Sequence, residues 1–298
     1  MQPAFAAVDW GTTSFRLWLL DRDGRVCGES AGPDGMTRAT GLFPKILAAH
    51  LGAAGAPAGL PVLVCGMAGA RQGWVEAPYL PLPARLDRLH EAAIRVPVPG
   101  DIRILPGLSQ NDPAAPNVMR GEETQLLGLP PSDGTRLVCM PGTHCKWTRM
   151  EGGTVTRFTT AMTGELFAAL SQHTVLRHSV KQSQTPADAP AFLAALDLVL
   201  DAPASIVTRL FELRAGQLLE VLGPEDGAAH LSGLLIGAEI GALRPRLDAP
   251  ILLAATGPLA GLYAAALTRA GLPFTTFDAA EATRRGLALA GSRIWSTP

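Results

Sequence analysis

Two short turns in the sequence carry residue types that suit phosphate binding. Each turn follows an apolar run and combines glycine with hydroxyl residues. A tight turn between strands offers backbone N–H groups and hydroxyls to phosphate oxygens, and an aspartate can hold Mg²⁺ through water. An ordinary capped hairpin is the alternative for each turn alone. The phosphate-contacting candidates are Asp9 (also the candidate metal ligand), Gly11, Thr12 and Thr13 in the first turn, and Gly142, Thr143 and Lys146 in the second.

The same order of elements is predicted around both turns. In each case a strand, a turn, a strand, a second turn and a third strand follow one another. A repeat of this kind indicates two similar α/β domains, and two matching phosphate turns favour a nucleotide held in a cleft between them. The predicted strands are Ala4–Asp9, Phe15–Asp21 and Arg25–Ser30 in the first copy, and Arg136–Met140, Lys146–Met150 and Thr154–Thr160 in the second.

The proline-rich segment 130–134 is the best candidate linker, so we expect domains at 1–130 and 131–298. A helix at 44–52, a buried strand at 61–65 and a helix at 122–129 complete the first domain, with a loop-rich stretch at 97–117. The second domain is expected to hold a helical insertion at about 166–243. Its further elements are helices at 190–200, 205–222 and 229–243, a strand, turn and helix at 251–270, a strand at 273–277 and a helix at 281–294.

A third turn, Ala254–Leu259, lies between an apolar strand and a helix and contains Thr256 and Gly257. Small residues let a flat ring approach the backbone, so this turn is a candidate adenine contact. A helix start packed tightly on a sheet is the alternative.

Two adjacent carboxylates are the best candidates for a general base. Glu122 and Glu123 fall in the first turn of a predicted helix next to Arg120, just before the linker. Acidic residues at this position also stabilise a helix through its dipole, so capping is the competing explanation. Asp112, in a polar loop, is a second candidate base.

The loop after the strand at 61–65 is suited to a hydroxylated acid. Arg71 can pair with a carboxylate, Gln72 with hydroxyls, and Trp74 with a carbon skeleton, although Trp74 would equally anchor the loop to the core. Arg120 and Glu165 are further substrate candidates. A nucleophile or metal role for His144 and Cys145 lacks a third partner at suitable spacing.

The composition of the chain limits the kinds of partner that it is expected to bind. The 298 residues are 47% hydrophobic and 17% charged, with a net charge of −1 and no basic block, which excludes disorder and argues against nucleic acid or an anionic membrane. Four cysteines without a CxxC pair indicate reduced thiols and a cytoplasmic protein. The N-terminus has no signal-peptide pattern. The uncharged run 249–268 contains two glycines and two prolines, so we expect no membrane span there.

Several longer blocks resemble one known family. They are VDWGTTSFRLWLLD, MAGARQGW followed by APYLPLPA, NVMRGEETQLLG, MPGTHCKW, and MTGEL with LSGLLIGAEI. Between residues 8 and 241 these blocks occur in order and are similar to the 2-dehydro-3-deoxygalactonokinase family of sugar kinases. The resemblance implies the actin-like ATPase fold, in which two ribonuclease-H-like domains close on ATP and a sugar.

The resemblance implies ATP- and Mg²⁺-dependent phosphorylation of 2-dehydro-3-deoxy-D-galactonate at its 6-hydroxyl, in galactonate or galactose catabolism. It places Asp9 at the Mg²⁺-linked acid of the first phosphate motif, Gly142 and Thr143 in the second, and Thr256 and Gly257 at the adenosine turn. That last turn departs from the glycine-richer pattern common in sugar kinases.

Many relatives place an aspartate base about twenty residues before the second phosphate turn. Here Glu122 and Glu123 stand there instead, and we favour Glu122. The alternatives are a kinase for another sugar or sugar acid, a phosphatase of the same superfamily, and a non-enzymatic regulator, which would usually carry a DNA-binding region. The sequence leaves the oligomeric state open, a homodimer included.

Overall fold

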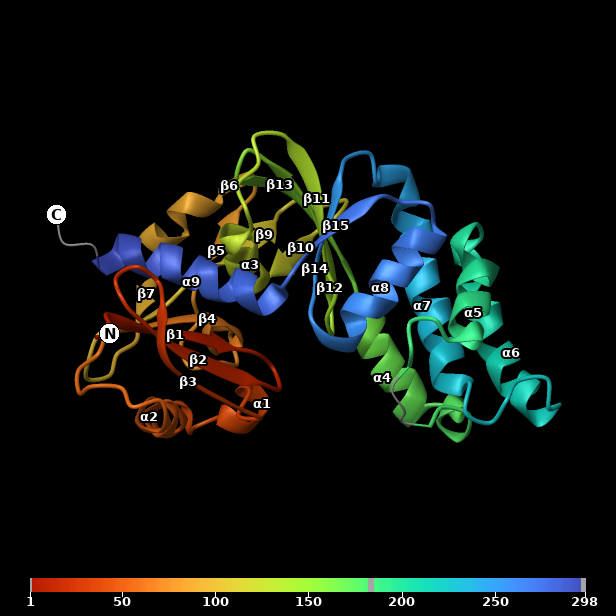
Figure 1. Ribbon diagram of the computed structural model, residues 1–298, viewed down its shortest axis with the longest axis horizontal. Coiled ribbons are helices and arrows are strands. Elements are labelled where there is room, and N and C mark those ends of the chain that lie inside the picture. The colour runs from red at the N-terminus through yellow and green to blue at the C-terminus, as the bar shows by residue number, and fades with distance from the viewer. Residues whose placement is uncertain (1, 182–184, 296–298) are drawn as a thin grey trace. The chain divides into compact units, whose positions relative to one another are not determined.

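A computed structural model describes residues 2–181 and 185–295 of the chain (Figure 1). By its internal contacts the chain divides into two units. The first unit runs to Gly134 and also takes in Met150–Phe158 and the segment that begins at Ala279. The second unit consists of Thr135–Arg149 and Thr159–Asp278. The first unit therefore includes two segments that lie beyond the boundary expected near residue 130.

A six-stranded sheet with the order β3-β2-β1-β4-β8-β7 forms the centre of the first unit. The antiparallel hairpins at its start are those expected from the alternating strands and turns, and β4 pairs parallel with β1. The strands of this sheet are β1 (Phe5–Trp10), β2 (Phe15–Leu20), β3 (Val26–Gly32), β4 (Val62–Gly66), β7 (Ile94–Arg95) and β8 (Ile102–Ile104).

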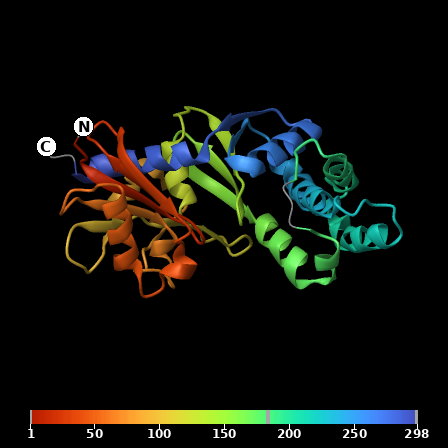
Figure 2. The same ribbon diagram turned by 60° about the horizontal axis from the view of Figure 1, so that its bottom comes forward.

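The two faces of this sheet are covered by different helices. Successive residues of a strand point to opposite faces, so Val8 faces α2 (Phe43–Ala53) and Ala7 faces α9 (Ala279–Trp295). Figure 2 shows α9, in blue, beside the red N-terminal strands. The remaining elements of the first unit are α1 (Met36–Ala39), α3 (Glu122–Gly128), the 3₁₀ turns η1 (Met67–Gly69) and η2 (Leu86–Ala92), and the strands β5 (Tyr79–Pro81), β6 (Ala84–Arg85), β9 (Gly107–Gln110) and β10 (Asn117–Met119).

The helix α3 lies directly on α9 because each helix has a glycine at the contact. A Cβ on Gly128 would fall 1.9 Å from the carbonyl oxygen of Ala282, and one on Gly286 would fall 1.9 Å from that of Thr124. The backbones therefore meet, and the candidate base residues at the start of α3 are held by the C-terminal helix.

A second six-stranded sheet has the order β15-β14-β11-β12-β13-β6. The strand β14 pairs parallel with both β11 and β15, and the strands β12 and β13 run through both units. Its strands, besides β6, are β11 (Thr135–Met140), β12 (Cys145–Glu151), β13 (Thr154–Ala161), β14 (Ile251–Ala254) and β15 (Phe274–Phe277).

The helices of the second unit pack on this sheet around a core that contains Trp147, Phe192, Ile240 and Tyr263. Their positions agree with the helical insertion and the strand-turn-helix predicted from the sequence. They are α4 (Thr163–His173), α5 (Pro190–Leu200), α6 (Ile206–Leu218), α7 (Gly227–Leu243) and α8 (Gly257–Arg269), with the 3₁₀ turns η3 (Val175–His178), η4 (Pro203–Ser205) and η5 (Arg244–Arg246).

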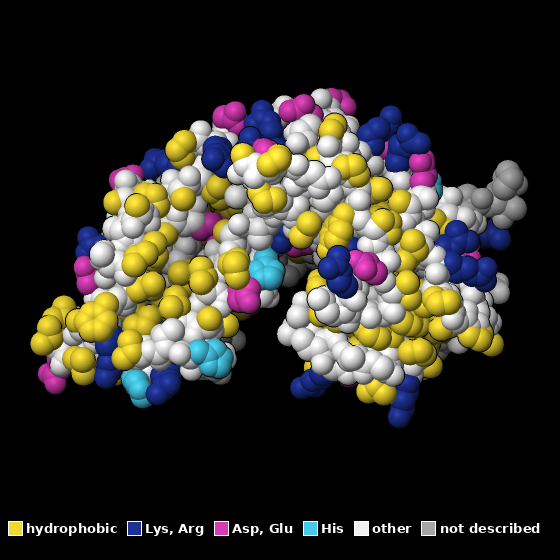
Figure 3. All heavy atoms as spheres, turned by 180° about the vertical axis from the view of Figure 1, so that it is seen from behind, with side chains coloured by type: hydrophobic (Ala, Val, Ile, Leu, Met, Phe, Trp, Pro, Cys, Tyr) yellow, Lys and Arg dark blue, Asp and Glu magenta, His cyan; other side chains and the backbone are white. Residues whose placement is uncertain are grey.

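Two sequence-based expectations were wrong in detail. The stretch 97–117 was expected to be loop-rich, yet it contains β8 and β9, whose three and four residues are too short to show a clear alternation. The helix expected at 205–222 ends at Leu218, since Glu220 has a φ of +58°. Only some of its apolar residues pack inward: Leu213 is buried, and Ile206 and Leu210 pack against the same core. Figure 3 shows hydrophobic side chains gathered on this surface, and the exposed ones are Val207, Phe211, Leu218, Leu219 and Val221.

Within the described ranges, no single helix is long and apolar enough to cross a membrane; the pair Pro190–Leu200 and Pro203–Leu218 passes the same test only jointly, across a bend of 113°. The uncharged run 249–268 forms β14 and α8, as expected. All four cysteines are free.

Candidate active site

The first phosphate turn of the first unit is fixed by its neighbours. The N–H of Gly11 donates to the carbonyl of Ser14 over 2.9 Å, and the N–H groups of Met36 and Thr37 donate to the carbonyls of Gly11 and Thr12. The side chains of Thr12 and Thr13 remain exposed. The turn is therefore rigid while its hydroxyls face solvent, which is the state a phosphate contact requires.

Asp9 lies at the end of β1 beside a cation and a thiol. Its Oδ2 accepts a 2.6 Å hydrogen bond from Nη2 of Arg16, the residue opposite it on β2. Its Oδ1 lies 3.9 Å from Sγ of Cys65, which is the residue opposite it on β4. The Asp9 side chain is 16% exposed, so one carboxylate oxygen is neutralised by Arg16 while the group still reaches the surface.

Glu123 lies in the same neighbourhood as Asp9. Burial raises the pKa of the Cys65 thiol well above its ordinary value, and the negative charges of Asp9 and Glu123 raise it further. A Cβ on Gly121 would fall 3.3 Å from the Cα of Gly66, so the start of α3 approaches the end of β4. The structure thus brings together Asp9 and the predicted acids of α3.

The two acids of α3 have different environments. Glu122 is half-buried, and its Oε2 accepts a 3.0 Å hydrogen bond from the N–H of Arg120. Glu123 is 1% exposed and accepts hydrogen bonds from the N–H of Gly121 at 2.7 Å and the hydroxyl of Thr124 at 2.9 Å. Burial, followed by the charge of Glu122, raises the pKa of Glu123 to about 7. Of the two, Glu122 is the carboxylate within reach of a ligand.

The third candidate base lies in a separate turn. Asp112 is exposed, and its Oδ1 accepts a 2.9 Å hydrogen bond from the N–H of Ala114. This is the local side-chain-to-backbone bond with which aspartate typically stabilises a turn. The geometry at Asp112 is fully accounted for by that structural role.

The loop after β4 places its three predicted substrate residues differently. Arg71 and Gln72 are exposed, and Nε of Arg71 lies 3.3 Å from Oε1 of Glu76. Trp74 stacks on Phe43, with ring centroids 5.8 Å apart, and makes an edge contact with Trp10. Trp74 therefore holds the loop on the core, the alternative that the sequence left open.

Arg120 holds the far end of the same loop. Its guanidinium lies 4.2 Å from the ring centroid of Tyr79 and donates from Nη2 to the carbonyl of Ala77 over 2.8 Å. Nε and Nη1 are buried and have no hydrogen-bond partner. The side chain is 9% exposed, so Arg120 links the loop to the start of α3.

The second phosphate turn, in the second unit, is supported by the start of α4. The N–H of Glu165 donates to the carbonyl of Thr143 over 3.0 Å. A Cβ on Gly164 would fall 2.5 Å from the carbonyl oxygen of Gly142, so only glycine permits this approach. Oε2 of Glu165 lies 2.5 Å from Nε2 of His144, and both side chains are exposed. Lys146, by contrast, is buried, with 4% of its surface exposed.

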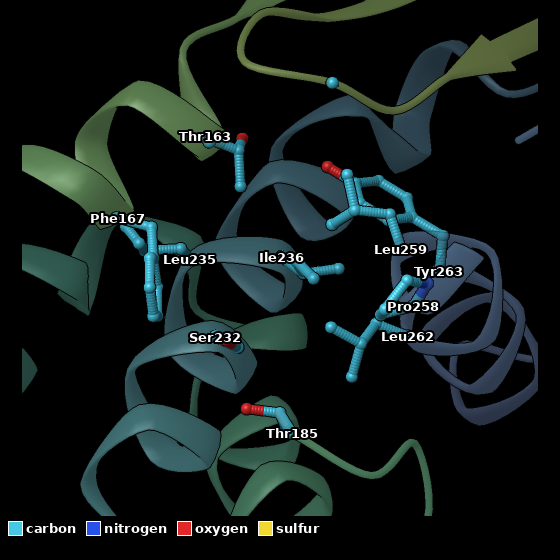
Figure 4. A pocket seen from close by; sticks show the side chains of 12 residues that line it. Thr163, Phe167, Thr185, Ser232, Leu235, Ile236, Pro258, Leu259, Leu262 and Tyr263 are labelled. Carbon is cyan, nitrogen blue, oxygen red and sulfur yellow. The ribbon is translucent and has the colours of Figure 1, made fainter. Parts of the chain in front are cut away.

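A cavity of about 230 Å³ extends from this turn through the second unit (Figure 4). Thr163 lies at one end, and Ser232 and Thr185 lie at the other. Gly142 also lines the cavity, and its carbonyl oxygen approaches Gly164, the residue after Thr163. Its walls between these ends are apolar and come from α4, α7 and α8: Phe167, Leu235, Ile236, Pro258, Leu259 and Leu262. An apolar cavity with polar groups at its ends is a typical small-molecule site.

The predicted adenosine turn borders this cavity. Thr256 precedes α8 and Gly257 begins it, and the cavity is lined by the next two residues, Pro258 and Leu259. The sequence reasoning missed the α7 wall, because Ser232, Leu235 and Ile236 belong to a helix whose buried residues lie on all its sides and give no separate signal.

Comparison with solved structures defines the class. The chain has the actin-like ATPase fold, which is also the fold of sugar kinases. One similar structure is an activator of 2-hydroxyisocaproyl-CoA dehydratase from Clostridium difficile, solved with bound ADPNP. It aligns over 99% of this chain and 98% of its own, with a TM-score of 0.55 at 12% identity. That likeness establishes the fold alone. A crystal structure from Sinorhizobium meliloti, described as a 2-dehydro-3-deoxygalactonokinase protein, aligns with a TM-score of 0.95 at 47% identity over 99% of this chain and 98% of that one.

Comparison of sequences defines the family. The model of the 2-keto-3-deoxy-galactonokinase family matches residues 9–290, and the chain belongs to that family. It is 49% identical over 299 aligned residues to a Rhizobium meliloti protein named probable 2-dehydro-3-deoxygalactonokinase, covering 98% of this chain and 97% of the relative. It is 37% identical to the Escherichia coli 2-dehydro-3-deoxygalactonokinase, with 96% and 97% covered. The resemblance inferred from the motifs is confirmed, and with it a phosphotransferase that uses ATP.

Proposed function

We propose that this chain transfers the γ-phosphoryl group of ATP to the 6-hydroxyl of 2-dehydro-3-deoxy-D-galactonate. The family supports the reaction class and the substrate named for its relatives. The observation that carries the proposal is the cavity of the second unit, which begins at the phosphate turn and continues between apolar walls. Such a shape suits a nucleotide, which has a charged end and a flat apolar ring.

The residues of the second unit are proposed to bind ATP. Gly142 and Thr143 would contact the phosphates through the turn, and Lys146 would supply positive charge beneath it. The adenine ring would lie between the α7 and α8 walls, next to the turn formed by Thr256 and Gly257. The start of α4 supports this arrangement, because it holds the turn in place through Thr143.

Asp9 and the first turn are proposed to hold Mg²⁺ and the transferred phosphoryl group. The residues fit the ion, since Asp9 and the hydroxyls of Thr12 and Thr13 supply the oxygen ligands that Mg²⁺ prefers. No group of three acidic, histidine or cysteine side chains suited to a metal occurs in the described part of the chain. A Mg²⁺ ion normally uses one or two carboxylates with substrate phosphates and water, so one aspartate suffices. When bound, the ion would neutralise charge on the phosphates.

Glu122 is proposed as the general base. It would accept the proton of the 6-hydroxyl as that oxygen attacks the γ-phosphorus in line with the departing ADP. Its partial exposure supports this choice over Glu123, which is buried. The N–H of Arg120 orients the carboxylate.

The sugar acid is proposed to bind at the loop after β4. Arg71 is exposed and can form a charge-assisted pair with the carboxylate of the substrate. Gln72 would contact hydroxyls, while Trp74 and Arg120 would keep the loop in position. Glu165 is a further candidate for a substrate hydroxyl. We retain the closing of two domains on the substrates, the cytoplasmic location and the oligomeric state as predictions.

A coupled ADP-release assay across a panel of sugars, sugar acids and 2-keto-3-deoxy sugar acids tests the function. We expect the highest kcat/KM with 2-dehydro-3-deoxy-D-galactonate and very slow ADP release in its absence. Faster turnover of another compound would reassign the substrate. Rapid ATP consumption without any sugar acid would instead favour the phosphatase alternative. Phosphorus NMR of the product identifies the phosphorylated hydroxyl.

A further inference from the structure

A buried carboxylate joins four elements around one end of the cavity. Glu239 on α7 is 7% exposed. It accepts hydrogen bonds from Nε1 of Trp147 on β12 at 2.6 Å, from the hydroxyl of Tyr263 on α8 at 2.8 Å, and from the hydroxyl of Thr163 at the start of α4. All three donors are neutral, and the two hydroxyls share the same carboxylate oxygen, Oε2.

These contacts fix the direction of both hydroxyls. An ionised carboxylate only accepts hydrogen bonds, and a hydroxyl group has a single hydrogen to donate. The hydrogens of Thr163 and Tyr263 are therefore both committed to Glu239. What remains on the Thr163 oxygen for any other partner is a pair of acceptor sites.

Thr163 and Tyr263 are part of the cavity lining. Figure 4 shows them on opposite sides of one end of the cavity, and both hydroxyls bind Oε2 of Glu239. The apolar side chains of Phe167 and Ile236 follow deeper in the cavity. Thr163 thus lies between the phosphate turn and the apolar walls, and it offers an acceptor at that point.

We propose that Glu239 is a positioning residue that makes Thr163 a hydrogen-bond acceptor for the nucleotide, and that the group it receives is a ribose hydroxyl. The inference rests on the proposed nucleotide site. In any nucleotide the ribose lies between the base and the phosphates, which is where Thr163 stands between the apolar walls and Gly142. Phosphate oxygens are acceptors and gain nothing from this oxygen, so they are left to the turn. An exocyclic amine of the base is the other donor with the same chemistry.

The test compares ATP with 2′-deoxy-ATP, 3′-deoxy-ATP and ITP, which lacks the exocyclic amine. For the unaltered enzyme we expect KM to rise about 10-fold for at least one deoxynucleotide, the size of one lost hydrogen bond, and to change little for ITP. Thr163→Val keeps the shape but has no hydroxyl. The ratio of the KM for that deoxynucleotide to the KM for ATP should therefore fall to about one. Thr163→Ser keeps the hydroxyl and should preserve the ratio.

Glu239→Gln tests the positioning role. The N–H of Trp147 can only donate, so the amide oxygen should face Trp147 and the amide nitrogen should face Thr163. The oxygen of Thr163 would then accept from the amide, which takes up an acceptor site, and the deoxynucleotide ratio should fall toward one. Tyr263→Phe is the matched control, because it removes one partner of Glu239 and leaves the Thr163 contact in place; it should retain the ratio. Thermal melting of each variant reports folding, and the Thr163 pair decides the question even if Glu239→Gln does not fold.

The outcomes separate this inference from the proposed function. Equal KM values for all four nucleotides in the unaltered enzyme, or an unchanged ratio in Thr163→Val, would overturn it. A ratio that appears only with ITP would support the acceptor and assign its partner to the base instead of the ribose. Calorimetric titration with the same nucleotides measures the ratio without turnover. An enzyme that binds ATP with this selectivity but phosphorylates no sugar acid would contradict the proposed function alone.

Discussion

The two candidate phosphate turns have similar backbone structures, but one is surrounded by carboxylates and the other by apolar side chains. Each connects antiparallel strands, contains glycine and threonine, and is buttressed by the start of a helix: α1 packs on the turn after β1, and α4 packs on the turn after β11. Around the first turn lie the carboxylates Asp9, Glu122 and Glu123. Around the second lies a largely apolar cavity.

This difference is the basis on which the proposed function gives the two units separate tasks. Carboxylates next to a turn suit proton transfer and a metal ion, whereas apolar walls next to a turn suit the base of a nucleotide. Each unit also contains one carboxylate that is nearly fully buried, Glu123 in the first and Glu239 in the second. Glu123 has a neighbouring acid, while Glu239 binds three neutral donors. The following predictions test whether this division is correct.

The largest effect is expected at the proposed base. Glu122→Gln should lower kcat by at least about 10²-fold, because the substrate hydroxyl loses its proton acceptor, while KM for ATP changes little. Steady-state kinetics with both substrates measure this. Asp112→Asn is the control and should retain nearly normal kcat. Near-normal turnover of Glu122→Gln would move the role to Glu123 or Asp112 and weaken the assignment of the first unit.

The next effect concerns the pH dependence of stability. Glu123 has a pKa of about 7 in the folded protein against an ordinary value of 4.5. The folded state therefore holds this proton more tightly than the unfolded chain, so stability should decrease as pH rises from about 4.5 to about 7, by up to about 3 kcal/mol. Above pH 7 this contribution becomes constant.

Glu123→Gln should remove that decrease, since glutamine does not titrate. Urea unfolding at a series of pH values measures the slope for both proteins. Glu122→Gln serves as the comparison, because removing the neighbouring charge should lower the pKa of Glu123 and reduce the slope without abolishing it. A slope that is identical in all three proteins would contradict the burial argument.

A pair of glycines tests the second turn. Gly164→Ala should cost about 1–3 kcal/mol of stability, because its Cβ would fall 2.5 Å from the carbonyl oxygen of Gly142. It should also raise KM for ATP by displacing the turn. Gly142→Ala is the matched variant: its Cβ would meet no heavy atom closer than 4.0 Å, so the melting temperature should stay close to that of the unaltered protein.

If the turn binds phosphate, Gly142→Ala should nevertheless raise KM for ATP, because the methyl group occupies space meant for the ligand. Calorimetric titration with ATP and a thermal melt give both quantities. Unchanged ATP affinity in both variants would remove the second turn from the nucleotide site.

The smallest effect is expected at the substrate carboxylate. Arg71→Ala should raise KM for the sugar acid about 10-fold, the usual cost of a lost charge-assisted hydrogen bond, and should leave KM for ATP unchanged. Glu76→Gln is the control, because the exposed pair of Arg71 and Glu76 contributes little to stability. An unchanged KM for the sugar acid in Arg71→Ala would exclude Arg71 from the carboxylate site.

Local patterns predicted most of the fold. The strands β1 and β2 and the helix α5 were expected within one residue of their observed bounds, because alternation, helical spacing and glycine turns all agree there. The strands at 102–110 escaped notice because three or four residues establish no period. The placement of α9 in the first unit depends on contacts with α3 far away in sequence, which no local pattern reveals.

The candidate site was predictable to a smaller extent. The sequence proposed Asp9, the turn at Gly142 and the pair of acids on α3 as candidates because glycine, hydroxyl and acidic residues are clustered there. The distinction between Glu122 and Glu123 needed the structure, since burial differs between adjacent residues of the same helix. The sequence did not suggest Glu239, because the three residues that donate hydrogen bonds to it come from distant segments.

The packing of α3 on α9 also affects the order in which parts of the protein can fold during synthesis. The residues around Glu122 are synthesised well before α9, the helix on which α3 rests. Domains generally fold as units while the chain emerges. The second unit can thus complete its core before α9 is synthesised, and the first unit gains the support of α9 only afterwards. A chain translated only as far as residue 278 would contain the residues that line the cavity of the second unit, but it would lack the helix that supports Glu122 and Glu123.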